Sequence, residues 1–104
     1  MKHRVPVAVL ALSTLVAAPA ALAVSETFAT YCAECHGEDG KAQTKEGKEK
    51  GARSFADKKW QEAVDDARLE KSIHKGRGKM PSFKGKLSDE EIKALVQEVR
   101  AFGK

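Results

Sequence analysis

The sequence is poor in cysteine and lacks both a strand pattern and a sustained basic stripe. Its two cysteines, Cys32 and Cys35, are three positions apart, so a disulfide between them would close only a very small loop. No segment alternates apolar and polar residues as a half-buried strand would, which predicts an all-α protein. No run of basic residues with interleaved aromatics occurs, so a nucleic-acid partner is not expected.

The 104 residues are enough for one small domain, and the first 23 differ in composition from the rest. A short basic start is followed by an apolar stretch and by the small-residue box Ala21-Leu22-Ala23, which predicts a secretory signal peptide over residues 1–23. Cleavage after Ala23 would leave a domain over residues 24–104, exported to the periplasm and without stable membrane insertion. The alternative is an uncleaved N-terminal anchor.

The run Cys32-Ala33-Glu34-Cys35-His36 predicts a c-type haem attachment site. Two thiols on one helical turn can reach two vinyl groups of one porphyrin, and His36 can then give its imidazole to the iron. The alternatives are a thiol–disulfide pair, for which no strand precedes Cys32, and a zinc site completed by His74. A covalent haem c would also supply apolar mass to a short chain with a marginal core.

Helical spacing and capping residues predict the helices. Ser25 is an N-cap for a helix that runs into the motif, and Asp57 and Asp65 or Asp66 can each start another. The last helix has a capping box at Ser88-Asp89-Glu90-Glu91, with an apolar stripe at Ile92, Leu95, Val96, Val99 and Phe102. Residues 41–56 are expected to be a surface loop with about one helical turn.

Met80 is the second predicted ligand of the iron. It is the only methionine after residue 23 and lies in a loop before Pro81, where core filling gives it little purpose. A thioether is a soft sixth ligand that favours ferrous iron and raises the potential. His74 is the competing candidate. Trp60 is expected in the core or as a donor to a haem propionate, and Arg53 is a weaker propionate candidate.

These features together resemble the class I cytochromes c, most closely the small monohaem bacterial cytochromes of the periplasm. The resemblance extends over nearly all of residues 24–104 and implies three to five helices around one covalent haem, with the first and last helices crossing beside it. In this sequence the matching positions are Phe28, the Cys32–His36 motif with Gly37, Gly40, and Met80-Pro81.

Three positions depart from that pattern. Val24 stands where the family often has glycine, and Glu98 stands where it often has an aromatic on the last helix, so Phe102 or Val99 is expected to contact Phe28 instead. No proline lies between Gly37 and Met80 to hold the histidine ring by its carbonyl. The group that orients His36 is therefore left open by the sequence.

With both axial positions filled by protein, iron has no open site, and the expected function is one-electron transfer by a soluble, monomeric carrier rather than catalysis. The alternatives are a haem subunit or domain of a larger oxidoreductase, or a ligand-binding sensor or peroxidase if Met80 is displaced. Redox proteins are the expected partners. Residues 71–87 hold six basic residues and no acid, which predicts docking at a basic rim formed by Lys75, Arg77, Lys79, Lys84 and Lys86.

Overall fold

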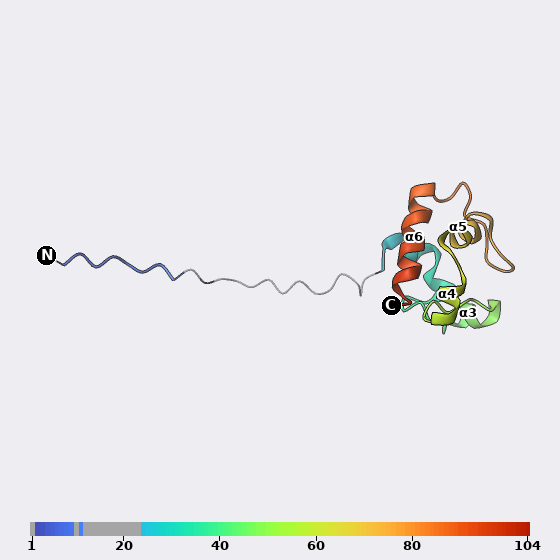
Figure 1. Ribbon diagram of the computed structural model, residues 1–104, viewed down its shortest axis with the longest axis horizontal. Helices are drawn as coiled ribbons and strands as arrows, with labels where there is room; N and C mark the ends of the chain where they lie inside the picture. The colour runs from blue at the N-terminus through green and yellow to red at the C-terminus, as the bar shows by residue number, and fades with distance from the viewer. Residues whose placement is uncertain (1, 10, 12–23) are drawn as a thin grey trace.

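The computed structural model describes residues 2–9, 11 and 24–104, and residues 24–104 fold into α-helices joined by loops (Figure 1). Within these residues there is no strand, and the only bridges are two isolated ones, Arg77 with Met80 and Lys84 with Leu87. The all-α prediction is confirmed. The six helices are α1 (Glu26–Tyr31), α2 (Ala33–His36), α3 (Lys45–Lys50), α4 (Lys58–Ala63), α5 (Asp66–Lys75) and α6 (Asp89–Ala101).

The structure divides the chain more finely than the three to five helices expected. The first predicted helix is interrupted at Cys32, which ends α1 and begins α2. The segment expected as a loop contains α3, which Thr44 caps at its start and Gly51 ends in the left-handed conformation. The sequence predicted only about one helical turn here, because the stretch is polar, contains glycine and has no apolar stripe that would face a core.

The predicted caps are present. Ser25, Asp57 and Asp65 each accept a hydrogen bond from the main-chain amide three residues later. Ser88 and Glu91 form both hydrogen bonds of the capping box at the start of α6. These side chains satisfy amides that the first helical turn leaves without partners, and so they fix where each helix begins.

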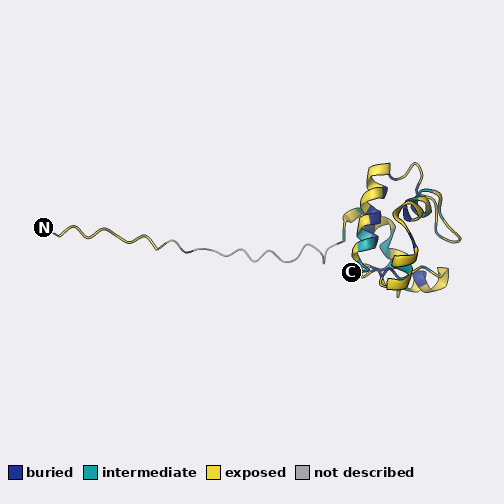
Figure 2. Cartoon of the chain, in the orientation of Figure 1, coloured by how far each residue is buried: buried dark blue, intermediate teal, exposed yellow. Residues whose placement is uncertain are grey.

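The core lies where α6 meets α1 and α5 (Figure 2). Phe28, Leu95 and Val96 have 1% or less of their surface exposed. Phe102 contacts Phe28, with ring centroids 5.3 Å apart, and so fills the place where Glu98 supplies no aromatic. A side chain at Gly40 would overlap the ring of Phe102, which explains glycine there.

One arginine ties the last helix to the middle of the chain. The Arg100 guanidinium donates to the main-chain carbonyls of Gln61 and Val64 and to the carboxylate of Asp66. Gln61 in turn donates to the carbonyls of Phe55 and Val99. The C-terminal half of α6 is therefore held against the α4–α5 junction, which forms one side of the site described below.

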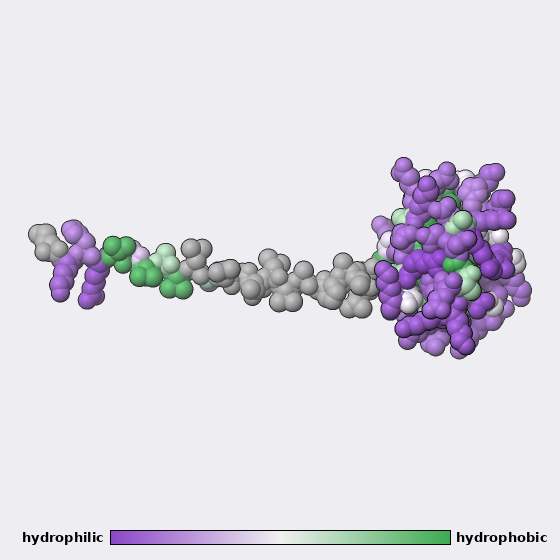
Figure 3. All heavy atoms as spheres, in the orientation of Figure 1, coloured by the Kyte–Doolittle hydropathy of each residue, from purple (hydrophilic) through white to green (hydrophobic). Residues whose placement is uncertain are grey.

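Most of the expected signal peptide, including the cleavage box at 21–23, lies outside the described residues. Residues 2–9 have no regular secondary structure, and Val5, Val7 and Val9 are each more than four-fifths exposed. Figure 3 contrasts this apolar stretch with a helical part whose surface is dominated by hydrophilic residues. No helix in the described part of the chain is long and apolar enough to cross a bilayer.

Candidate functional site

A bend between two short helices presents the Cys32–His36 motif. Cys32 has φ −118° and ψ −36°, and its amide closes α1 on Phe28 while its carbonyl accepts from His36. The four-residue α2 then ends at Gly37, whose positive φ turns the chain away. Cys32, Cys35 and His36 consequently line one side of a single cavity.

The segment that follows the motif, from Thr44 into α3, packs against α2 and bonds to its carbonyls. The Thr44 hydroxyl shares its one proton between the carbonyls of Glu34 and Cys35, at 2.6 and 3.0 Å, and accepts from the amide of Gly47. A side chain at Gly47 would overlap the Cys35 carbonyl oxygen, so α3 can approach α2 this closely only with glycine there. The last carbonyls of α2 are thus satisfied without any further helical turn.

The carbonyl of Arg53 orients His36. The His36 Nδ1 atom lies 2.9 Å from this oxygen, and because a carbonyl can only accept, Nδ1 carries the proton. The other ring nitrogen, Nε2, is left with its lone pair. Burial lowers the pKa of His36, and the Arg53 hydrogen bond opposes that shift to a smaller extent. His36 therefore has the neutral ring and free Nε2 lone pair that a metal ligand needs, and the carbonyl contact that the missing proline left open is made by Arg53.

Cys32 and Cys35 are free thiols, so the small disulfide loop is not formed. Burial, followed by the negative charges of Glu98 and Cys35, raises the pKa of the Cys32 thiol to about 11. In the described residues no three histidine, cysteine or acidic side chains are grouped as metal ligands, which argues against the zinc alternative. No strand flanks the motif, which argues against the thioredoxin-like one.

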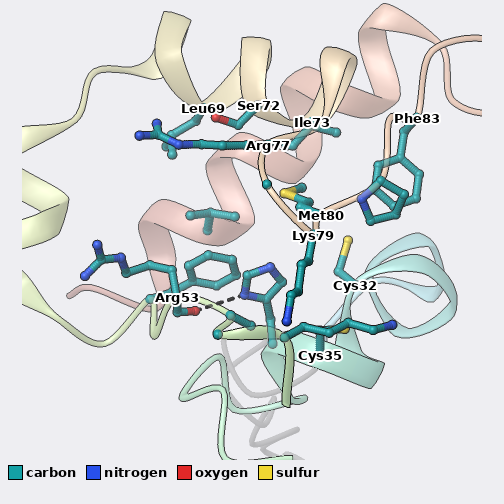
Figure 4. Close-up of a pocket in the computed structure, with 18 of the residues that line it drawn as sticks. Cys32, Cys35, Arg53, Leu69, Ser72, Ile73, Arg77, Lys79, Met80 and Phe83 are labelled. Atoms are coloured by element: carbon teal, nitrogen blue, oxygen red, sulfur yellow. Dashed lines mark hydrogen bonds between the residues drawn. The ribbon is translucent and has the colours of Figure 1, made fainter. Parts of the chain in front are cut away.

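Met80 enters the same cavity from a tight hairpin. The amides and carbonyls of Arg77 and Met80 bond to each other at 3.1 and 2.9 Å, and Gly78 takes φ +57° between them. The hairpin is anchored to the end of α5, where Ser82 donates to the carbonyl of His74. In Figure 4 Met80 lies across the pocket from Cys35 and the Arg53 carbonyl.

His74, the competing candidate, lies outside the cavity wall. Its ring nitrogen is 3.9 Å from the Asp89 carboxylate, where α5 ends near the start of α6. Its carbonyl, rather than its imidazole, supports the Met80 loop by accepting from Ser82 and Lys84. The geometry therefore favours Met80 over His74 as the residue that faces His36.

The cavity wall combines apolar and cationic residues. The cavity measures about 360 Å³, and its lining includes the buried apolar residues Phe55, Val64, Leu69, Ile73, Phe83 and Val99. Five cationic residues and no acidic one also line it: Lys50, Arg53, Arg68, Arg77 and Lys79. An apolar macrocycle with two carboxylates matches such a wall, so the residues present fit a haem.

Trp60 and Arg53, the two propionate candidates, both line this cavity, with the Arg53 guanidinium carbon 5.7 Å from the Trp60 ring centroid. Sequence reasoning missed Arg68 and Phe55 as parts of the wall. Arg68 precedes the core residue Leu69 on α5, which was its only signal. Nothing in the sequence around Phe55 indicates that its ring stacks on that of His36.

The comparisons with known proteins agree with this geometry. Residues 19–97 match the family model described as "Cytochrome C oxidase, cbb3-type, subunit III". The chain is 40% identical over 86 residues to the cbb3-type cytochrome c oxidase subunit FixP of Azorhizobium caulinodans, covering 82% of this chain and 28% of the relative. It is 37% identical over 91 residues to subunit CcoP of Rhodobacter capsulatus, covering 80% and 29%.

The chain thus spans less than a third of the length of these curated relatives. A solved structure, the KustC0563 c-type cytochrome, is similar over a larger share of its own length. It is 44% identical, with a TM-score of 0.71, and the match covers 75% of this chain and 94% of that chain.

Proposed function

This chain belongs to the cytochrome c family described as cbb3-type cytochrome c oxidase subunit III, and we propose that it serves as an electron-transferring haem subunit of an oxidoreductase. Membership of the family means that the chain binds haem c covalently. When bound, haem c supplies a one-electron Fe(III)/Fe(II) couple. In this proposal Cys32 and Cys35 form the thioether links, and His36 and Met80 are the axial ligands.

The observation that carries this proposal is that the two halves of the site converge on one cavity. Cys32, Cys35 and His36 line it from α2, and Met80 lines it from a hairpin more than 40 residues later. Binding of a single haem explains why the Cys32–His36 motif and Met80 line the same cavity. With His36 and Met80 both used as ligands, no position remains for a substrate, so the site supports electron transfer rather than catalysis.

Each remaining part of the wall has a role in this proposal. The buried apolar residues, among them Leu69, Ile73 and Phe83, exclude water from the centre of the cavity. The arginines at its edge, Arg53, Arg68 and Arg77, are available to pair with the two carboxylates. The Arg53 carbonyl holds the proton on Nδ1 of His36 and leaves Nε2 for the iron.

The similarity to FixP and CcoP favours a subunit over a freely diffusing carrier. A soluble, monomeric carrier is the second candidate, and one observation favours it: the KustC0563 cytochrome is matched over 94% of its own length. In either case the partners are redox proteins, and the export signal proposed over residues 1–23 would place the domain in the periplasm. A retained N-terminal segment would instead anchor it there.

Affinity purification of the full chain from its native membranes and periplasm distinguishes these candidates. A subunit would co-purify with haem-containing membrane proteins in the detergent extract, and a free carrier would be recovered alone from the periplasmic fraction. N-terminal sequencing of the same material would show Val24 first if the signal is cleaved. Rapid carbon monoxide binding by the reduced protein would contradict a closed site and favour the sensor or peroxidase alternative.

A further inference from the structure

We propose that Phe55 is a positioning residue that fixes the plane of the His36 imidazole, acting together with the Arg53 carbonyl. The inference rests on the proposed role of His36 as an axial ligand and goes beyond it, because it assigns what sets the ligand's rotation. The Phe55 and His36 rings are stacked, with centroids 4.3 Å apart and planes inclined by 19°.

The two contacts restrain different motions of the same ring. The hydrogen bond from Nδ1 to the Arg53 carbonyl acts at the ring edge and limits where that nitrogen can point. The stacked Phe55 ring covers one face of the imidazole and opposes tilting toward that side. Arg53 and Phe55 are two positions apart in the segment between α3 and α4, so this short stretch supplies both restraints.

Phe55 is itself fixed in place, so it can restrain the His36 ring. Only 7% of its surface is exposed, and its amide donates to the carbonyl of Gly40 at 2.7 Å. Its ring also contacts those of Phe28, Trp60 and Phe102, with centroid distances of 6.4, 5.7 and 6.0 Å. Contacts with these three rings leave Phe55 little freedom to move, so its orientation restrains that of His36.

This role has a spectroscopic consequence that a purely structural role lacks. The plane of an axial imidazole sets how unpaired spin is distributed over the porphyrin of a low-spin ferric haem. The haem-methyl proton resonances of the oxidised protein therefore report the ring orientation. A change in Phe55 that frees the imidazole should redistribute these resonances even if the domain remains folded and fully loaded.

The test compares oxidised, haem-loaded variants by proton NMR. Phe55→Leu should shift the order or spread of the haem-methyl resonances, and Phe55→Tyr, which keeps a flat ring, should restore the wild-type pattern. The control is Phe102→Leu, which should give a smaller shift: it leaves the Phe55 ring and its contact with His36 in place, and Phe102 packs on Phe55 and Phe28 but does not line the cavity. Where Phe55→Leu does not fold, Phe55→Met provides the same comparison with a flexible side chain of similar volume.

A methyl pattern in Phe55→Leu or Phe55→Met that matches wild type, with ligation intact, would overturn the positioning role and leave the proposed function standing. An equal shift in Phe102→Leu would also overturn it, since general loosening of the aromatic cluster would then explain the effect. Absence of a low-spin, histidine-ligated signal from the wild-type protein would instead contradict the proposed function itself.

Discussion

Glu98 on α6 accepts two hydrogen bonds from Ser25, which lies 73 positions earlier and caps α1. One carboxylate oxygen accepts from the Ser25 amide and the other from its hydroxyl, each at 2.7 Å. The same hydroxyl oxygen accepts from the amide of Phe28, so the cap and the interhelical contact share one side chain. At this position a polar clamp replaces the aromatic contact that the family resemblance implied, and Phe102 supplies the aromatic instead.

Glu98→Gln should weaken this clamp, because the charge and one of its acceptor oxygens are lost. Hydrogen bonds to charged groups contribute about 1.5–3 kcal/mol, and because this pair is partly exposed the expected loss is about 1 kcal/mol. Urea unfolding of the haem-loaded protein measures it. Glu38→Gln, an exposed turn residue outside the helices, makes the same change in charge and should leave the midpoint unchanged. Equal effects of the two substitutions would mean that the clamp adds no stability.

Met80→Ala should open the sixth coordination position. The reduced variant should then bind carbon monoxide readily, and the reduction potential should fall, within the range of about 0.8 V that axial ligation can span. Difference spectra and a redox titration measure the two effects. His74→Ala should change neither, because His74 lies outside the cavity. Changes with His74→Ala and none with Met80→Ala would reverse the ligand assignment.

Docking of an acidic partner is predicted at the basic rim, in which Lys79 lines the cavity and both Lys79 and Lys84 are exposed. Lys79→Glu with Lys84→Glu should slow bimolecular electron transfer to that partner by about tenfold at low ionic strength. Lys45→Glu with Lys48→Glu on α3 makes the same change in net charge as a control. Stopped-flow rates across a salt series test this, and equal losses from both pairs would show that only net charge matters.

Gly47→Ala should disturb the haem motif from outside the cavity. The added methyl group would overlap the Cys35 carbonyl, so α3 must move away from α2. Overpacking of this kind costs about 1–3 kcal/mol, and here it would also strain the Thr44 hydrogen bonds. Thermal unfolding compared with Lys48→Ala, an exposed change on the same helix, measures the loss. Equal stability of the two variants would show that α3 does not support the motif.

The sequence was a good guide wherever a residue type carries the signal. Serine and aspartate caps and the apolar stripe of α6 predicted four helices because each depends on local side-chain chemistry. The predictions for the cysteines, His36 and Met80 also rest on residue type. That they converge on one cavity is a tertiary fact that spacing alone could not establish.

The contacts that the sequence did not predict are made by main-chain atoms or depend on two segments lying close together in the fold. Any residue at position 53 could offer the carbonyl that holds His36, so its identity as arginine gave no hint. Glycine has a low helix propensity, yet at position 47 it permits the contact between α3 and the Cys35 carbonyl. The stacking of Phe55 on His36 requires a fold in which residues 19 positions apart face each other.

The central claim is that Cys32 and Cys35 attach one haem beside His36, and peptide mass spectrometry of the haem-loaded protein tests it most directly. The account predicts one haem retained after acid–organic extraction, carried on the peptide that contains residues 32–36. It also predicts no covalent haem and a largely unfolded chain in Cys32→Ala with Cys35→Ala, because the core loses its largest apolar body. Haem found on another peptide, or a folded and colourless double variant, would contradict the account.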